Sequence, residues 1–201
     1  MVNKSSDIAK WNSHHWIPRK DVAALLVIDM QMFFASLARE ILKPLRHLIQ
    51  TCRILDVPVI YTAHGHRDPH KDAGMLGIWW HDLIIEGTGD HRIIKEIAPE
   101  PGEKVLPKRR YSAFFGTDLD QYLRGKGIED LIISGVMTNL CCETTARDAF
   151  IRDYRVFFLA DGTATIDPEL HTATLKNLAF GFATVLTIAD VESGWESVVT
   201  V

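Results

Sequence analysis

Cysteine is scarce in this sequence: its 201 residues include three, at positions 52, 141 and 142. So few cysteines do not make the disulfide framework of a small secreted domain, and they favour a reducing compartment, the cytoplasm. The polar N-terminus lacks the apolar core of a secretory signal peptide. Because no apolar run reaches about 18 residues, we also expect no transmembrane helix and no membrane partner.

The chain also lacks a large excess of positive or negative charge. The chain has 22 lysines and arginines against 26 aspartates and glutamates, which gives a formal net charge of −4. Its one basic cluster is short and lies at residues 107–110. This balance argues against a nucleic-acid partner. Hydrophobic residues make up 47% of the chain, as is ordinary for a globular protein.

The length is sufficient for one domain with a sizeable core, which we expect over residues 21–201. Residues 1–20 are largely polar but include two tryptophans. We interpret them as an N-terminal arm that packs on the domain or on a neighbouring subunit. The alternative is a frayed chain end.

Apolar runs alternate with amphipathic segments along the domain. Buried strands are predicted at residues 23–28, 57–61, 103–106, 131–133, 155–160 and 184–188. Helices are predicted between them, and Pro44 is expected to kink one of these or to begin a second helix. A short helix is also expected over residues 93–97. The alternation predicts an α/β fold: a single three-layer α/β/α domain, doubly wound and Rossmann-like, with a six-stranded, mostly parallel sheet.

Asp29, Lys108 and Cys141 each come shortly after the end of a predicted strand. Because the carboxyl ends of parallel strands meet at one edge, we expect the three to share the crevice where the strand order reverses. Each also has a plainer interpretation. Asp29 fits a turn or cap, Lys108 a solvated surface lysine, and Cys141 a small buried side chain.

The three side chains together make a coherent catalytic arrangement. Thr138 and Asn139 offer oxygens that cap a helix, which places Cys141 near a helix N-terminus. There the helix dipole and the charge of Lys108 are expected to lower the pKa of the thiol. Asp29 would take the thiol proton and later return one to a leaving amine. The sulfur would attack a carbonyl and form an acyl-enzyme, which water then hydrolyses.

Three ordered motifs resemble those of the isochorismatase-like cysteine hydrolases. The first, Leu-Val-Ile-Asp-Met-Gln-x-x-Phe, covers residues 26–34. The second, Pro-Lys-Arg-Arg-Tyr-Ser-Ala-Phe-Phe-Gly-Thr, covers residues 107–117. The third covers residues 135–149 and begins Gly-Val-Met-Thr-Asn-Leu-Cys-Cys. The resemblance extends over nearly the whole chain after residue 23.

The resemblance implies roles for particular residues. It makes Asp29, Lys108 and Cys141 catalytic, with Cys141 as the nucleophile. It also implies a cis peptide bond between Val136 and Met137, and an oxyanion hole formed by the N–H groups of Met137 and Cys141. It further implies a homo-oligomer, which we expect to be a dimer or tetramer.

The adjacent cysteine, Cys142, is interpreted as a packing residue. Neighbouring side chains on a helix point about 100° apart, so only one of the two cysteines can face the crevice. By its position in the third motif, that one is Cys141.

Two departures from the family pattern narrow the substrate. The nicotinamidase branch of the family binds a metal through an Asp-x-His pair after the second strand and a later histidine. This chain has His64-Gly65-His66 and Leu83 at those places. We therefore expect no metal and no cofactor, and nicotinamide hydrolysis is disfavoured, although binding of an ion by His64 and His66 stays open. The isochorismatases carry glycine at the nucleophile position, so Cys141 argues against their ether hydrolysis.

Several residues near predicted strand ends are candidates for binding a small-molecule substrate. The loop over residues 68–89 contains adjacent tryptophans and is expected to fold over a pocket or into a subunit contact. The candidates are Phe34, His64, Trp79, Trp80 and Tyr111.

Three functions remain open at this point. The first is a cysteine-dependent hydrolase that cleaves an amide, carbamoyl or ureido C–N bond of a small molecule. The second is an isochorismate-type vinyl ether hydrolase that uses Asp29 without the thiol. The third is a non-catalytic binding or thiol-redox protein on the same scaffold, with the cysteine pair as a peroxide sensor.

Overall fold

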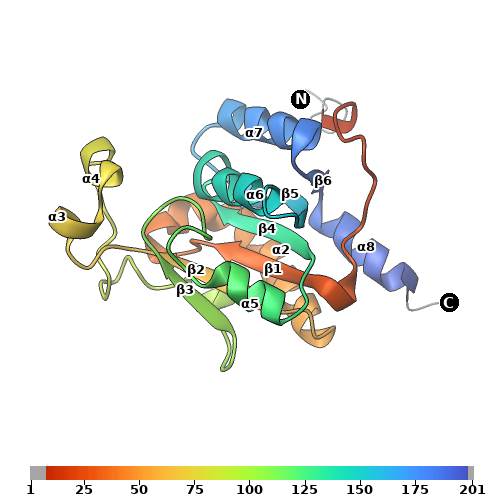
Figure 1. Ribbon diagram of the computed structural model, residues 1–201, viewed down its shortest axis with the longest axis horizontal. Helices are drawn as coiled ribbons and strands as arrows, with labels where there is room; N and C mark the ends of the chain where they lie inside the picture. Colours follow the sequence, from red (N-terminus) through yellow and green to blue (C-terminus); the bar gives the residue numbers. More distant parts are fainter. Residues whose placement is uncertain (1–7, 199–201) are drawn as a thin grey trace.

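The apolar runs of the sequence form one parallel sheet. In chain order its strands are β1 (Ala23–Ile28), β2 (Val59–His64), β3 (Lys104–Lys108), β4 (Asp130–Val136), β5 (Arg155–Ala164) and β6 (Thr184–Leu186). They lie side by side in the order β3-β2-β1-β4-β5-β6, and every neighbouring pair is parallel (Figure 1). The computed structural model describes residues 8–198, so residues 1–7 of the predicted arm and 199–201 lie outside the described residues.

Helices cover both faces of this sheet. The helices α2 (Ala35–Ile54) and α8 (Ile188–Val198) pack on one face, and α5 (Leu119–Gly125), α6 (Glu143–Phe150) and α7 (Pro168–Gly181) pack on the other. The short helices α3 (Pro69–Asp72) and α4 (Met75–Trp79) project beyond the sheet (Figure 1). Single turns of 3-10 helix lie at Lys20–Val22, Met32–Phe34 and Lys95–Ile97, and a π-helical turn lies at Thr138–Cys142.

The predicted doubly wound α/β fold with six strands is therefore confirmed, and the sheet is parallel throughout rather than mostly parallel. Between residues 8 and 198, no helix combines the length and the apolar character that crossing a bilayer requires.

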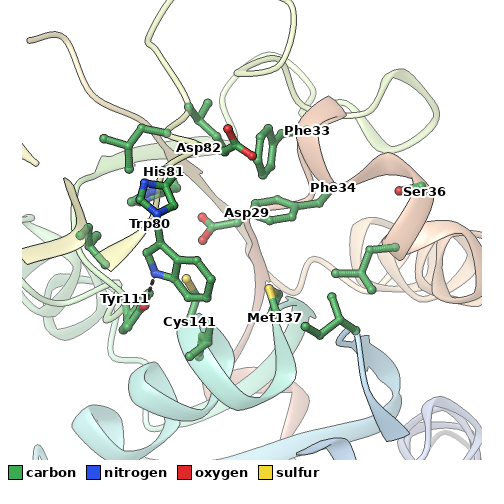
Figure 2. Close-up of a pocket in the computed structure, with 17 residues that line it drawn as sticks. Asp29, Phe33, Phe34, Ser36, Trp80, His81, Asp82, Tyr111, Met137 and Cys141 are labelled. Carbon is green, nitrogen blue, oxygen red and sulfur yellow. Dashed lines mark hydrogen bonds between the residues drawn. The ribbon is translucent and has the colours of Figure 1, made fainter. Parts of the chain in front are cut away.

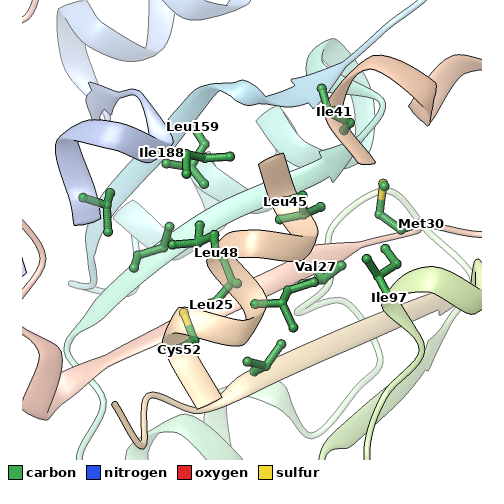
Figure 3. Close-up of a cluster of buried hydrophobic side chains, with 14 of the residues drawn as sticks. Leu25, Val27, Met30, Ile41, Leu45, Leu48, Cys52, Ile97, Leu159 and Ile188 are labelled. Atoms are coloured by element: carbon green, nitrogen blue, oxygen red, sulfur yellow. The ribbon is translucent and has the colours of Figure 1, made fainter. Parts of the chain in front are cut away.

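The core has one layer on each face of the sheet. Successive side chains of a strand point to opposite faces, so Leu25 and Val27 of β1 pack toward α2, while Leu26 and Ile28 pack toward the other helices. Figure 3 shows Leu45 and Leu48 of α2 on the same side of the sheet as Leu25 and Val27 of β1. Both faces of β1 are buried, which explains why its sequence is apolar without interruption.

Helix α2 continues through Pro44, so the alternative that Pro44 begins a second helix is wrong. Proline removes one backbone hydrogen bond from a helix interior. On either side of it, Ile41 and Leu45 are buried in the core. Burial of this apolar stripe offsets the lost bond and keeps the helix in one piece.

Several element boundaries differ from the prediction. Strand β5 extends to Ala164, and the helix expected over residues 93–97 is a single 3-10 turn. The C-terminal helix α8 was not predicted, although Ile188, Val191 and Trp195 are buried at helical spacing. These short or terminal segments take their conformation from packing on the sheet.

The described part of the predicted arm packs on the domain. The Asn12 side chain pairs with the backbone of Val185 on β6, donating to its carbonyl at 2.8 Å and accepting from its N–H at 3.1 Å. The Trp195 indole donates to the Pro18 carbonyl at 2.7 Å. These contacts tie Asn12 to the edge strand β6 and Pro18 to α8.

The strand order reverses between β1 and β4, and the two strands approach each other closely where β1 ends. Gly135 pairs with Ile28 in the sheet and has a φ of +109°. A Cβ atom at Gly135 would lie 2.0 Å from the Ile28 carbonyl oxygen. Only glycine permits this close approach. As a result, the residues that follow Ile28 and those that follow Gly135 lie next to each other at the carboxyl edge of the sheet.

We predict that Gly135→Ala prevents folding or lowers the free energy of unfolding by more than about 3 kcal/mol, because the new methyl group collides with backbone. Gly102→Ala is the matched control. It has a φ of +96° but open space around the position, so it should cost only about 1 kcal/mol of backbone strain. Urea denaturation measures both variants. Equal losses would show that the close approach of β1 and β4 does not matter.

Candidate active site

Asp29, Lys108 and Cys141 meet at the carboxyl edge of the sheet. The Lys108 Nζ atom lies 2.7 Å from Asp29 Oδ2 and 3.3 Å from Cys141 Sγ. It also donates to the Arg110 carbonyl at 3.0 Å. All three side chains are buried, with exposed fractions of 0% for Asp29, 2% for Lys108 and 8% for Cys141. Three separate strand ends therefore bring a carboxylate, a lysine ammonium and a thiol together.

Asp29 and Lys108 form a buried ion pair at rest. Burial alone would raise the pKa of Asp29, but the charge of Lys108 and hydrogen bonds from Lys108 and Thr62 bring it below the usual value. The Thr62 hydroxyl donates to Asp29 Oδ1 at 2.6 Å. Burial likewise opposes the charge on Lys108, yet the neighbouring Asp29 and Cys141 raise the pKa of the lysine. Each member keeps the other ionised.

The pKa of the Cys141 thiol is raised, whereas the sequence led us to expect a lowered one. Burial raises its pKa to about 12, and the charge of Asp29 adds to this effect while Lys108 opposes it. The predicted lowering of the thiol pKa is therefore wrong for the resting protein. Cys141 lies in a buried π-helical turn, and neither Thr138 nor Asn139 caps a helix with its side chain. The thiol is protonated at rest and needs a base beside it, which Asp29 can provide.

The turn that carries Cys141 begins at an unusual peptide bond. The bond between Val136 and Met137 is cis. Met137 and Cys141 both reach the cavity described next. The side chains that were expected to cap the turn contact other elements instead: Thr138 Oγ1 lies 2.9 Å from His171 Nδ1, and Asn139 accepts a hydrogen bond from Thr165 at 2.6 Å.

A cavity of about 480 Å³ opens above Asp29 and Cys141 (Figure 2). It is largely apolar, and its walls come from the ends of β1, β2 and β4, from α2, and from the segment after β2. The lining residues are Asp29, Phe33, Phe34, Ser36, Leu37, His64, Leu76, Trp80, His81, Asp82, Leu83, Ile84, Tyr111, Met137, Leu140, Cys141 and Ile166. Its size suits a small molecule.

Four of the five predicted substrate-binding candidates line this cavity. They are Phe34, His64, Trp80 and Tyr111, and the Trp80 indole donates to the Tyr111 hydroxyl at 2.7 Å (Figure 2). The fifth, Trp79, does not line it and is 71% exposed. Trp79 ends a one-turn helix, so it points away from the cavity when its neighbour points inward.

Other residues of the site were missed from the sequence. Thr62, which orients Asp29 from below the cavity, carries a signal because it is polar within an apolar strand. His81 and Asp82 directly follow the predicted candidate Trp80 and fit the same loop argument. Ile166 comes from the segment after β5 and carries no local signal.

His64 is held at the cavity wall by the buried Gln31. The Gln31 amide accepts from the His64 N–H at 2.8 Å and donates to the His64 carbonyl at 3.0 Å and the His91 carbonyl at 2.8 Å. The His64 Nδ1 atom is buried and has no hydrogen-bond partner among the described residues. Burial, with help from Lys108, lowers the pKa of His64 to about 4. His64 is therefore a neutral polar group facing the cavity.

The described histidines of this region lack the third ligand side chain that a metal site would need. Within the described ranges, no three His, Cys, Asp or Glu side chains come together in a way that could hold a metal ion. The rings of His64 and His66 are 5.2 Å apart and perpendicular, and His66 Nδ1 lies 3.0 Å from Asp72 Oδ1. The side chains present do not fit the metal of the nicotinamidase branch.

The family is shown by comparison with known proteins. The model of the isochorismatase domain matches residues 23–190. This chain belongs to the isochorismatase family. The predicted resemblance is confirmed, and the protein is an isochorismatase-family hydrolase.

Individual relatives cover most of the chain. Nicotinamidase 3 of Arabidopsis thaliana is 51% identical over 182 residues, 89% of this chain and 91% of that protein. A cysteine hydrolase from Pseudomonas syringae pv. phaseolicola 1448A superposes with a TM-score of 0.86 at 30% identity, covering 91% of this chain and 96% of that one. N-carbamoylsarcosine amidase from Thermoplasma acidophilum superposes with a TM-score of 0.73 at 33% identity, covering 83% and 96%.

The neutral state of His64 predicts a pH dependence of stability. Its pKa falls from 6.5 to about 4 on folding. As the pH drops through this range, the unfolded chain binds a proton that the folded protein does not, so stability is lost. The loss reaches about 3 kcal/mol between pH 7 and pH 4. We expect His64→Gln to remove this part of the loss, as measured by urea denaturation at several pH values.

The control for this prediction is the exposed His70, which is changed to glutamine in the same way. His70→Gln should retain the full loss of stability of the wild type. An unchanged pH dependence in His64→Gln would show that His64 does not stay neutral in the folded protein.

Proposed function

We propose that this protein is a cysteine-dependent amidohydrolase that cleaves a C–N bond of an amide, carbamoyl or ureido group in a small molecule. The observation that carries the proposal is the contact of Lys108 with both Asp29 and Cys141 at the floor of the cavity. Two of the relatives carry amidase names, nicotinamidase and N-carbamoylsarcosine amidase, which supports C–N cleavage here.

In the first step Asp29 takes the proton of the Cys141 thiol as the sulfur attacks the substrate carbonyl. Because the resting thiol has a raised pKa, proton transfer and formation of the S–C bond proceed together. The positive charge of Lys108 stabilises the sulfur as it loses its proton. The N–H groups of Met137 and Cys141 hold the oxygen of the tetrahedral intermediate.

In the second step protonated Asp29 gives its proton to the departing nitrogen, the C–N bond breaks, and a thioester with Cys141 remains. A water molecule then gives a proton to Asp29 and attacks the thioester. Collapse of this second intermediate releases the acid, and the Cys141 sulfur regains its proton from Asp29. The sum is hydrolysis of the C–N bond with every group restored.

The cavity favours an uncharged, planar substrate. None of the described residues that line it is a lysine or arginine, and the nearby Lys108 is already paired with Asp29. A substrate carboxylate would find no cation, and it would face the carboxylate of Asp82 at the exposed rim. Phe34 and Trp80 supply flat apolar walls. An aromatic carboxamide matches this environment.

The compartment, the domain bounds and the oligomeric state are also part of the proposal. We propose that the enzyme works in the cytoplasm as a homo-oligomer, with one hydrolase domain over residues 21–201 and an arm over residues 1–20. All three cysteines lie in the described chain and are free, which supports a reducing compartment. The exposed side chains of Met75, Ile78 and Trp79 support a contact between subunits.

The first test is release of ammonia from benzamide, nicotinamide, acetamide and N-carbamoylglycine. We expect the wild type to hydrolyse at least one amide and Cys141→Ala to lose activity by at least about 10³-fold, because no thioester can form. Cys142→Ala is the matched control and should stay within about threefold of the wild type. Equal activity of Cys141→Ala and wild type would exclude the thiol mechanism and make isochorismate the next substrate to test.

The second test concerns substrate charge. Asp82→Lys should raise kcat/KM for N-carbamoylglycine relative to benzamide by about tenfold, because a cation replaces an anion at the rim. Asp21→Lys makes the same change of charge at the opposite end of β1 and should leave the ratio unchanged. If both variants shift the ratio equally, Asp82 does not select the substrate.

A further inference from the structure

We propose that Arg109 is a positioning residue of this active site, which holds the cap of the substrate cavity in place. The cap is defined as residues 68–86, the segment that includes α3 and α4 and projects beyond the sheet (Figure 1). It contributes Leu76 and residues 80–84 to the cavity wall. The inference rests on the proposed amidohydrolase function and concerns how the same site binds its substrate.

The cap is closed on itself at its base. The His66 N–H donates to the Ile84 carbonyl at 2.9 Å, and the Glu86 N–H donates to the His66 carbonyl at 2.9 Å. These bonds bring the two ends of the segment together next to β2. They do not determine how far the tip of the cap lies above the cavity, which requires contacts with another element.

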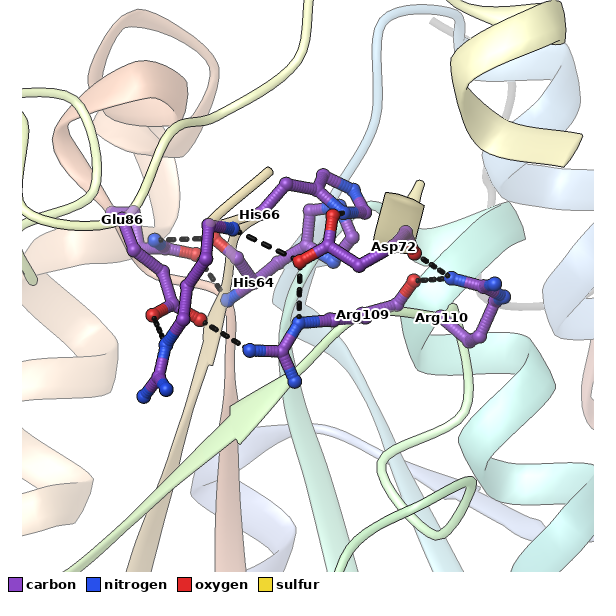
Figure 4. A network of polar contacts seen from close by, with 8 residues as sticks. His64, His66, Asp72, Glu86, Arg109 and Arg110 are labelled. Atoms are coloured by element: carbon purple, nitrogen blue, oxygen red, sulfur yellow. Dashed lines mark hydrogen bonds and ion pairs between the residues drawn. The ribbon is translucent and has the colours of Figure 1, made fainter. Parts of the chain in front are cut away.

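Arg109 provides such a contact from the end of β3. Its Nε atom donates to Asp72 Oδ2 at 2.9 Å, and its Nη2 atom donates to Glu86 Oε1 at 2.9 Å (Figure 4). Asp72 is the last residue of α3, the first helix of the cap. Glu86 is the last residue of the cap. One guanidinium therefore bridges two residues that are far apart in the cap's sequence and connects both to the segment after β3. Its planar fork suits two separate carboxylates, which a lysine ammonium cannot engage in the same geometry.

Residues on either side of Arg109 extend this link in both directions. Arg110 donates to the Asp72 carbonyl at 2.9 Å, while its own carbonyl accepts from Lys108. The Tyr111 hydroxyl accepts from Trp80, the aromatic wall of the cap. Four consecutive residues thus connect the catalytic lysine to the cap. Arg109 is the one whose side chain neutralises charge on the cap.

Loss of Arg109 should affect binding more than chemistry. Two carboxylates, Asp72 and Glu86, would then lie near each other without the cation between them, and the cap would move away from the sheet. The reacting groups Asp29 and Cys141 do not touch Arg109. Trp80 would lose its fixed position over the substrate ring. The effect should therefore be larger for an aromatic amide than for a small aliphatic amide that cannot reach Trp80.

The experiment measures kcat and KM of full-length Arg109→Met for benzamide and acetamide. We expect KM for benzamide to rise about five- to tenfold with kcat within about twofold, and KM for acetamide to change by less than about twofold. Arg109→Lys should fall between the wild type and Arg109→Met, because it restores the charge without the fork. A fall in kcat at constant KM would overturn the proposal.

The matched control is Arg67→Met. Arg67 pairs with the other oxygen of Glu86 at 2.6 Å, but its side chain is 75% exposed and does not reach β3. Its backbone N–H bond to Asp72 survives the substitution. Arg67→Met should leave both kinetic constants unchanged. An equal rise of KM in both variants would indicate general loosening of the loop and would contradict a specific role for Arg109.

A second measurement does not depend on turnover. Alkylation of Cys141 by iodoacetamide, located by peptide mass, reports access to the cavity floor. It should be about five times faster in Arg109→Met than in the wild type and unchanged in Arg67→Met. Unchanged alkylation in a folded Arg109→Met overturns the proposal. If the wild type hydrolyses no amide, the proposed function fails, while the alkylation rates still decide the role of Arg109. Should Arg109→Met not fold, Arg109→Lys and Glu86→Gln take its place.

Discussion

The buried ion pair of Asp29 and Lys108 is the interaction on which the rest of the site depends. Removing two charges from water is costly, and the pair persists only because each remaining polar atom has a partner. Thr62 of β2 donates to Asp29, while the Arg110 carbonyl and the Cys141 sulfur accept from Lys108. The strands β1, β2, β3 and β4 must therefore be adjacent for the pair to exist. The order of the sheet is a condition of the chemistry.

The same pair defines what the thiol can do. Burial and the negative charge of Asp29 raise the pKa of Cys141, and Lys108 offsets only part of this effect. In the proposed mechanism, the reaction then depends on transfer of the proton to Asp29 at the moment of attack. The same apolar walls surround the thiol and, in the proposed function, disfavour a charged substrate, so one feature of the cavity bears on both reactivity and selectivity. The end of β3 connects the catalytic groups to the cap, because Lys108 belongs to the ion pair while the next residue, Arg109, contacts the cap.

Much of this could be predicted from local sequence. The strands appear as apolar runs because both faces of a parallel sheet are buried, and the helices appear as stripes because one face packs on the sheet. Asp29, Lys108 and Cys141 were identified because each follows a strand, and parallel strands bring such residues to one edge. Phe34, His64, Trp80 and Tyr111 followed from the same rule. Trp79 was predicted by the same rule but does not line the cavity, because its direction depends on the rotation of a one-turn helix.

The sequence by itself therefore determined the fold class, the family and the residues that meet at the edge of the sheet, because apolar period and motif order are local properties of the chain. Only the tertiary structure decided the state of those residues. The direction of the Cys141 pKa depends on how deeply the thiol is buried, and the neutrality of His64 depends on the same packing. The bridge from Arg109 to Asp72 and Glu86 joins residues 23 to 37 positions apart. Burial and contacts of this range arise from the assembled layers, and no short stretch of sequence contains them.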